Sequence, residues 1–304
     1  MDRPEPGIYF GVSYDEYAAW EGVRSTQLRT MYDKTPAHYR YLLDHPNETE
    51  TPSMTLGRAT HTAILEPDRF DSEYILHPET YTNEKGDERP WHGGAKACKE
   101  WVAARKAAGQ TVLSADDYAR CCGMRDAVWE SDGDARALVK AGKSEVCVVW
   151  NDAETGLPCK ARIDLYIEQT CGVVDLKTAR TAQQQAFGSA AYRMGYLAQV
   201  CFYFDGVKAV TGTEGPLPAI IAAESSPPYP VAVYRVPDVT WLETGRFQYA
   251  EALRKVRRCQ EKDRWPGYPK KATDLVFPTW AGTELGLAPG DWDDDDEDES
   301  LGIV

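Results

Sequence analysis

The fold class of this chain is decided by the stretch CKARIDLYIEQTCGVVDLKTA, residues 159–179. Apolar and polar residues alternate through KARIDLYI and recur through GVVDLK, which is the period of a half-buried β-strand. The segment EQTC between them is short enough to close a hairpin. The pattern therefore predicts two antiparallel strands, in which a loop over residues 168–171 places Asp164 directly opposite Asp175.

The two opposed carboxylates indicate a cation-binding site. Directly opposite residues have Cβ atoms about 4.5–5.5 Å apart, so the two charges repel unless a proton or a cation lies between them. Acidic oxygen pairs suit Mg²⁺, which leaves its other positions to water and phosphate. Lys177 shares the face of Asp175 and is able to orient a water or to stabilise charge on a phosphate. The pattern is typical of phosphodiester hydrolysis; a surface hairpin with a solvated Lys–Asp pair is the alternative.

Outward from this hairpin, helical and strand patterns alternate. Helical periodicity, often preceded by a capping Ser or Thr or by a first-turn Pro, covers residues 26–32, 36–43, 53–66, 96–108, 115–130, 184–204 and 239–262. Strand patterns cover residues 145–150, 160–167, 172–177, 218–223 and 231–236. Residues 80–95 are polar and Gly-rich, so we expect an exposed loop there. The order predicts an α/β fold: a helical region to about residue 140, then a mixed central β-sheet flanked by helices over about 141–268.

Composition excludes several classes of protein. The net charge of −14 excludes a uniformly basic nucleic-acid-binding surface, and the 42% of hydrophobic residues exclude global disorder. Eight acids lie in DWDDDDEDES, residues 291–300. We therefore expect residues 1–290 to form a single domain and residues 291–304 to be a disordered acidic tail.

The cysteine pattern and the hydropathy of the sequence predict where in the cell the protein is found. The eight cysteines form no CxxC pair and no zinc or iron–sulfur spacing, which favours reduced core residues. No apolar run approaches the roughly 18 residues that a membrane span needs, and the first three residues open no signal peptide. We expect a cytoplasmic protein without a membrane partner.

The hairpin resembles the active-site hairpin of the PD-(D/E)xK nuclease superfamily, which has a restriction-endonuclease-like core. More closely, the chain is similar to the RecE-type (exonuclease VIII) exonucleases of phages and prophages, in the RecB-like branch. The resemblance spans about residues 5–268 and rests on four motifs in order: RSTQLRTMYDKTPAHYRYL (24–42), LGRATHTAILEPDRF (56–70), GLPCKARIDLYI (156–167) followed by VVDLKTA (173–179), and Q-x3-Y at Gln199 and Tyr203.

The resemblance implies roles for the residues of the hairpin and of the second motif. Asp164 and Asp175 match the two metal-binding carboxylates, and the backbone carbonyl of Leu176 is a further ligand. His61, the histidine of G-x3-H, matches a helical histidine that joins the metal ligands. Lys177 matches the catalytic lysine.

Further positions follow from the same resemblance. Gln199 and Tyr203 are one helical turn apart and would face the site, where they position the DNA strand or the catalytic lysine. For Tyr192 and Tyr196, on the same stripe, we expect plain core packing. Glu145 lies where related nucleases often carry an acid. Three roles remain open for it: a ligand of a second metal ion, a neighbour of the metal ligands, or a solvated strand end.

Local basic residues would contact DNA if the chain is a nuclease. Arg58 lies near the helical histidine, and Lys160 and Arg162 share the face of Asp164. The last helix carries five more, for which a solvated face is equally compatible: Arg246, Arg254, Lys255, Arg257 and Arg258.

The resemblance implies a Mg²⁺-dependent exonuclease on double-stranded DNA ends, with Mn²⁺ able to substitute and with neither an iron–sulfur cluster nor a nucleotide cofactor. It also implies processive 5′→3′ degradation that leaves 3′ single strands for recombination with a RecT-type single-strand annealing protein. A ring-shaped homotetramer in the host-cell cytoplasm, if phage-encoded, is expected. Alternatives are a structure-specific or restriction-like endonuclease on the same scaffold and a non-catalytic DNA-binding assembly protein.

Overall fold

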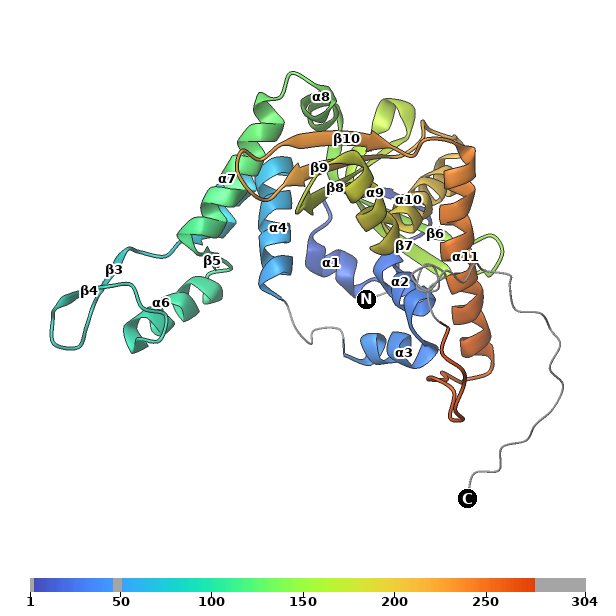
Figure 1. Cartoon of the computed structure of the whole chain (residues 1–304), viewed down its shortest axis with the longest axis horizontal. Helices are drawn as coiled ribbons and strands as arrows, with labels where there is room; N and C mark the ends of the chain where they lie inside the picture. The colour runs from blue at the N-terminus through green and yellow to red at the C-terminus, as the bar shows by residue number, and fades with distance from the viewer. Residues whose placement is uncertain (1–2, 46–50, 277–304) are drawn as a thin grey trace, which may run out of the picture. The chain divides into compact units, whose positions relative to one another are not determined.

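The computed structural model describes residues 3–45 and 51–276, and a six-stranded sheet lies at its centre (Figure 1). Neighbouring strands pair antiparallel except β8 and β9, which pair parallel, so the sheet is mixed as predicted. In spatial order the strands are β1 (Gly7–Tyr9), β6 (Lys143–Asn151), β7 (Pro158–Ile167), β8 (Gly172–Ala179), β9 (Ala219–Glu224) and β10 (Val231–Arg235).

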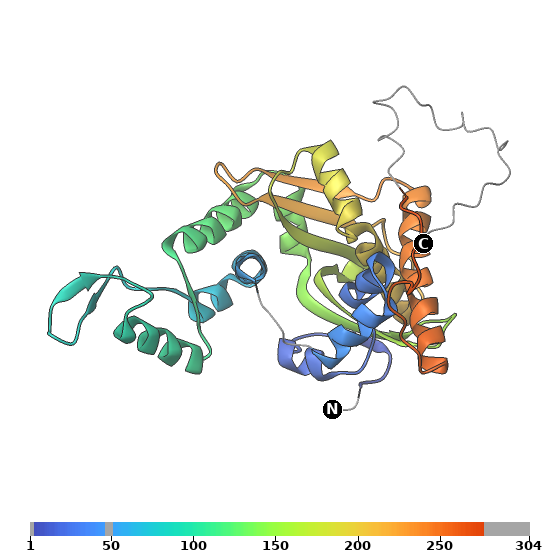
Figure 2. The same cartoon turned by 60° about the horizontal axis from the view of Figure 1, so that its bottom comes forward.

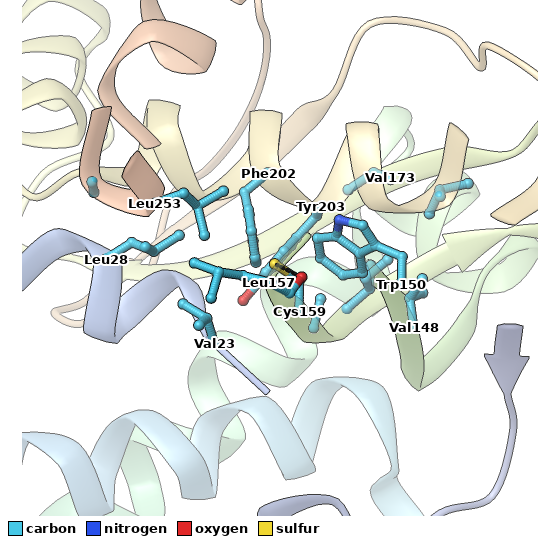
Figure 3. Close-up of a cluster of buried hydrophobic side chains, with 14 of the residues drawn as sticks. Val23, Leu28, Val148, Trp150, Leu157, Cys159, Val173, Phe202, Tyr203 and Leu253 are labelled. Atoms are coloured by element: carbon cyan, nitrogen blue, oxygen red, sulfur yellow. Dashed lines mark hydrogen bonds between the residues drawn. The ribbon is translucent and has the colours of Figure 1, made fainter. Parts of the chain in front are cut away.

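Helices cover both faces of this sheet (Figures 1 and 2). One face packs against α4 (Pro52–Leu65), α7 (Ala115–Glu130) and α8 (Asp134–Ala141). The other packs against α2 (Ser25–Asp33), α3 (Pro36–Asp44), α9 (Gln184–Arg193), α10 (Tyr196–Thr211) and α11 (Val239–Glu261). Figure 3 shows the centre of this second layer, where Phe202 of α10 lies between Trp150 of the sheet on one side and Leu28 of α2 and Leu253 of α11 on the other. The short helix α1 (Tyr14–Ala19) packs on β6.

Capping residues explain where the predicted helices begin. The Thr51 side chain accepts the Met54 N–H at 3.3 Å at the start of α4, and Ser114 does the same for α7. α4 ends at Leu65, and Pro67 begins the next helix, α5 (Pro67–Glu73), because a proline fits the first turn of a helix.

The segment after α5 differs from the predicted loop. It contains β2 (Tyr74–Leu76), β3 (Thr80–Thr82), β4 (Glu88–Pro90), α6 (Lys96–Ala107) and β5 (Thr111–Leu113). β3 and β4 form an antiparallel hairpin inside residues 80–95. Its turn is closed by Asn83, whose side chain accepts the N–H groups of Lys85 and Asp87 at 2.9 Å, so the loop prediction is wrong for these strands.

The predicted helix over residues 184–204 is two helices. Gly195, with φ of 72°, separates α9 from α10. A residue in the left-handed region ends an α-helix, and glycine adopts that region without a steric penalty. The break changes the direction of the chain just before the Q-x3-Y motif.

The register of the central hairpin is as predicted. Ile167 pairs with Gly172 and Leu165 with Val174, across a loop that contains a 3-10 turn at Glu168–Thr170. The same register places Asp164 opposite Asp175, one step beyond the last pair of the ladder.

The predicted assignment of faces is wrong in part. Ala161 and Ile163 pack in the cluster beneath α10, whereas Leu165 and Ile167 pack beneath α4, so the alternation along β7 reverses at Asp164. A local irregularity of the sheet thus coincides with the predicted acidic site.

The compact unit ends at Pro266, and the described residues 267–276 belong to a second unit. The predicted boundary at residue 290 and the acidic tail over 291–304 lie outside the described residues. All eight cysteines are described and unpaired, and six of them are buried, in agreement with the prediction. Within residues 3–45 and 51–276, no helix is long and apolar enough to cross a membrane.

Candidate metal centre

Three potential metal ligands converge from one helix and two strands. His61 of α4, Glu145 of β6 and Asp164 of β7 each offer one ligand atom, and these atoms all lie within 4.8 Å of one another. The helical histidine and the first predicted acid are therefore brought together as expected. Glu145, for which the sequence left three roles open, joins them rather than forming a solvated strand end.

An unusual backbone conformation positions Glu145. Its φ is 55°, in the left-handed region that a non-glycine residue seldom adopts. The residue interrupts the β6–β7 ladder opposite Asp164, between the pairs Ser144–Leu165 and Val146–Ile163. Strained backbone of this kind costs on the order of 1–3 kcal/mol and is concentrated at functional sites. The strained residue of β6 is thus also one of the three converging ligands.

Asp164 is held by two partners. Its Oδ2 accepts the backbone N–H of Leu176 at 2.7 Å, and its Oδ1 lies 3.6 Å from Nδ1 of His61. Burial alone would raise the pKa of Asp164, but His61, Lys177 and the Leu176 N–H together hold it below its ordinary value. Burial would likewise lower the pKa of His61, and Asp164 reverses this so that the pKa is raised. A negative charge is thus maintained on Asp164.

Arg162 contacts Glu145 rather than open solvent. Its Nε donates to the Glu145 carboxylate, and its Nη1 donates to the Val12 carbonyl at 2.8 Å. Burial and the charge of Asp164 raise the pKa of Glu145, and Arg162 opposes this rise. Only 13% of the Arg162 side chain is exposed. The guanidinium therefore orients a potential ligand, a role that the sequence interpretation as a DNA contact missed.

Asp175 lies beside this group and is paired with Lys177. The Lys177 Nζ lies 2.7 Å from the Asp175 Oδ2, and Asp175 is 1% exposed. Apart from this ion pair, neither carboxylate oxygen of Asp175 accepts a hydrogen bond from a described residue. Burial raises the pKa of Asp175 to about 6. An acid that is buried with so few partners is suited to a further positive charge.

Lys177 is clamped between a carboxylate and a ring. Its Nζ lies 4.7 Å from the centroid of the Tyr196 ring. Tyr196 precedes the Q-x3-Y motif by three residues. Burial would lower the pKa of Lys177, but Asp175 and Asp164 raise it above its ordinary value. The side chain is therefore an ammonium at neutral pH, which favours charge stabilisation over proton abstraction.

The expected core packing holds for Tyr196, which packs against the buried cluster between α9, α10 and the sheet, but it is wrong for Tyr192. Tyr196 contacts the ammonium of Lys177, and Tyr192 is 48% exposed. The spacing Y-x2-Q-x3-Y could have indicated the first of these, because residues three and seven positions apart share a helix face.

Gln199 and Tyr203 form a hydrogen-bonded pair at the edge of the site. The Gln199 Nε2 donates to the Tyr203 Oη at 2.8 Å, and the Ser25 Oγ lies 3.3 Å from the same oxygen. Burial and the charge of Asp175 raise the pKa of Tyr203 to about 12. Ser25, the first residue of α2, is thus a neighbour of the site.

Lys160 lies away from these side chains. It is 2% exposed, and its Nζ donates to the carbonyls of Tyr17 at 2.8 Å, of Ala18 at 3.2 Å and of Trp20. An ammonium has three N–H groups, so these bonds use all of them at the end of α1. The predicted DNA contact of Lys160 is therefore wrong for this structure.

Several arginines of α11 form ion pairs with carboxylates of this chain. Ion pairs join Arg246 to Asp205, Arg254 to Glu154 and Arg257 to Glu261. These contacts fit the alternative of a largely solvated, internally paired helix face.

A cleft of about 570 Å³ gives access to the three converging ligands. Its walls include His61, Glu145, Asp164 and the exposed Arg58. Gly57 also lines it, and a Cβ added there would meet no atom within 4 Å. Two carboxylates, an imidazole and a neighbouring buried acid form a donor set that fits a divalent cation with water and phosphate as further ligands.

Comparison with known proteins agrees with this geometry. The family described as a PDDEXK-like domain of unknown function (DUF3799) matches residues 25–275. The crystal structure of a protein from Eubacterium rectale, assigned as an exonuclease, is similar over 91% of this chain and 98% of that chain, with a TM-score of 0.56 and 14% identity. At this identity the similarity shows the fold. No curated protein matches the chain.

Proposed function

The chain belongs to the family of PDDEXK-like domains of unknown function (DUF3799), and from this premise we propose that it is a divalent-metal-dependent nuclease acting on double-stranded DNA ends. The observation that carries the proposal is the convergence of His61, Glu145 and Asp164 within 4.8 Å, beside the buried pair of Asp175 and Lys177. Hydrolysis of a phosphodiester needs charge neutralisation on both the attacking and the leaving side.

His61, Glu145 and Asp164 would hold the cation, with Asp175 and the carbonyl of Leu176 as further candidate ligands. When bound, a divalent cation lowers the pKa of water and polarises a phosphate oxygen. Mg²⁺ suits the oxygen donors, and Mn²⁺ tolerates the imidazole better than Mg²⁺ does.

The side chains around the cation have separate tasks. Hydrolysis adds water across one P–O bond, and negative charge grows on the phosphate oxygens. Lys177 is an ammonium held by Asp175 and Tyr196, so it can stabilise that charge without moving far. Gln199 keeps the Tyr203 hydroxyl in place beside this pair.

The finer properties of the proposal come from the resemblance to RecE-type exonucleases. They are 5′→3′ processive digestion, a homotetrameric ring around the duplex, and delivery of 3′ single strands to a single-strand annealing protein for recombination. The exposed Arg58 in the cleft is the best-placed candidate contact for a phosphate.

The test compares two forms of the same DNA. Linear duplex and covalently closed circles are incubated with the protein and Mg²⁺, Mn²⁺ or a chelator, and acid-soluble nucleotides are measured. An end-dependent exonuclease digests the linear form only, and the chelator stops it.

The same assay has two outcomes against the proposal. Nicking of closed circles at a similar rate would favour an endonuclease on this scaffold. Absence of hydrolysis with every divalent metal, while DNA binding persists, would favour a non-catalytic DNA-binding protein.

A further inference from the structure

We propose that two adjoining cavities on the α9–α10 side of the sheet bind successive unpaired nucleotides of one DNA strand. The first, the Gln199 cavity, is lined by Ser25, Tyr192, Arg193 and Gln199 among others, and the second, the Trp241 cavity, by Phe187, Tyr192, Tyr234, Arg235 and Trp241 among others. The inference rests on the proposed nuclease function and adds a single-strand site to it.

The Gln199 cavity adjoins the candidate active site. Two of its lining residues, Ser25 and Gln199, contact the Tyr203 hydroxyl at 3.3 and 2.8 Å. Tyr196, one turn before Gln199 on α10, holds the Lys177 ammonium. A ligand in this cavity would therefore lie within one or two side chains of the reacting groups.

The two cavities are joined by a shared aromatic wall. Tyr192 lines both of them, and their volumes are about 270 and 280 Å³. Each is at the small end of the range for ligand sites, so each suits one nucleotide rather than a folded partner. Two such cavities in series, divided by one ring, fit a chain of nucleotides better than a single compact ligand.

The aromatic side chains of these cavities are left open to solvent. Tyr192 is 48% and Trp241 45% exposed, although the chain buries most of its other large apolar residues. Exposed rings on which unpaired bases stack are the usual device of proteins that hold single strands without sequence preference. Stacking on Tyr192 from both cavities would keep two neighbouring bases apart from their complement.

Two arginines supply the matching charge. Arg193 of the Gln199 cavity and Arg235 of the Trp241 cavity are exposed, and neither has a carboxylate within 4.0 Å among residues 3–45 and 51–276. Arg29, the third arginine of the two cavities, is by contrast paired with Asp33 at 3.1 Å. Unpaired cations beside open rings suit a phosphate backbone with stacked bases.

The experiment measures binding separately from hydrolysis. A fluorescent oligothymidylate is titrated with the full chain in chelator, which prevents cleavage, and its anisotropy is recorded. Tyr192→Ala and Trp241→Ala should each weaken binding about tenfold, whereas Tyr192→Phe should keep the wild-type affinity because the ring remains. Arg193→Gln should lower the slope of log K against log salt by somewhat less than one, the amount that one phosphate contact contributes on a single strand.

The matched control is Phe247→Ala. Phe247 lies on α11 like Trp241 and is 62% exposed, but it lines neither cavity. It should bind the oligonucleotide as wild type does. Equal affinity of all variants would overturn the proposal, and so would an equal loss in Phe247→Ala, which would show unspecific contact with exposed rings.

Two further arms distinguish the possible failures. Thymidine monophosphate should bind far more weakly than the oligonucleotide; equal affinity would overturn the strand site in favour of a nucleotide site. If wild type digests linear duplex while Tyr192→Ala and Trp241→Ala bind the oligonucleotide normally, the inference fails and the nuclease function stands. If wild type binds the oligonucleotide through these rings but hydrolyses nothing, the proposed function fails and the strand site stands.

Discussion

Asp164 accepts the backbone N–H of Leu176 at 2.7 Å, at the level where β7 and β8 stop pairing. One carboxylate oxygen thus closes the gap between the strands, and the other is left to face His61 at 3.6 Å. The orientation of the candidate ligand is set by the sheet backbone. Such support usually decides whether a metal site is tight or loose.

The first prediction concerns metal binding by this carboxylate. Asp164→Asn keeps an oxygen that accepts the Leu176 N–H but removes the charge, so the fold should persist while the metal affinity falls. In wild type, metal at about 100 times its dissociation constant should raise the free energy of unfolding by about 2.7 kcal/mol. Thermal unfolding with and without Mn²⁺ should show this shift in wild type and little of it in Asp164→Asn.

Glu66→Gln is the matched control for this experiment. Glu66 lines the same cleft, but its carboxylate pairs with Arg69 and lies outside the group of converging ligands. It should retain the metal-induced shift. Equal shifts in wild type and Asp164→Asn would exclude the metal centre at this position.

The second prediction concerns the ring beneath Lys177. Tyr196→Leu removes the ring, and a cation–π contact of about 0.5–2 kcal/mol is lost, so turnover should fall about two- to thirtyfold. Tyr196→Phe should keep most of the turnover. Single-turnover hydrolysis of linear duplex checks both variants, and their melting temperatures are measured alongside. A purely packing role would lower the melting temperature of Tyr196→Leu without a selective loss of turnover.

The third prediction separates orientation from DNA contact at Arg162. Arg162→Gln leaves Glu145 in a mostly buried place without its cation, which should cost about 2–4 kcal/mol of unfolding free energy. Urea denaturation measures this loss. Arg58→Gln, in the same cleft but exposed, should instead lower the slope of log K for DNA binding against log salt by about one. A stable Arg162→Gln with a reduced salt slope would restore Arg162 as a DNA contact.

The fourth prediction concerns the pH dependence of stability. Burial lowers the pKa of Lys160 to about 8, from an ordinary value of 10.5. Between pH 8 and 10.5 the unfolded chain therefore holds a proton that the folded chain has released, and stability rises with pH through this window. The free energy of unfolding of wild type, relative to Lys160→Met, should increase by about 1–3 kcal/mol from pH 8 to pH 10.5.

Denaturation of both proteins at several pH values provides the measurement. Other groups that titrate in this window are common to wild type and variant, so they cancel in the difference. Lys208→Met, which removes an exposed lysine of α10, controls for the loss of a lysine as such. A flat difference for Lys160→Met would mean that its three carbonyl bonds keep the ammonium charged.

The hairpin at the centre of the fold was predictable because its signals are local. Alternation of side chains and the length of the loop together determine the register that places Asp164 opposite Asp175. The long helices were predictable for the same reason, since their caps lie within a few residues of their first turns. Gly195 was the exception: its positive φ follows from the change of direction between α9 and α10, which no local pattern records.

The site was predictable in its residue types and less so in its contacts. The placement of Glu145 beside His61 and Asp164 depends on a left-handed backbone angle in the middle of a strand, which strand propensity argues against. Lys160 and Arg162 share a face with Asp164 by periodicity, yet α1 and the N-terminal segment cover that face and take both cations. Such contacts join residues about 140–150 positions apart, so they follow from tertiary packing alone.

The parallel pairing of β2 with β5 brings Tyr74 beside Thr111, so the residues between them leave and rejoin the fold at one point (Figure 1). Tyr74 and Thr111 both line the cleft. Because the two ends of the segment over residues 77–110 lie side by side, this segment can be shortened, enlarged or exchanged without shifting the strands that carry the acids. Through this segment, the wall of the cleft and its chemistry are free to evolve independently of each other.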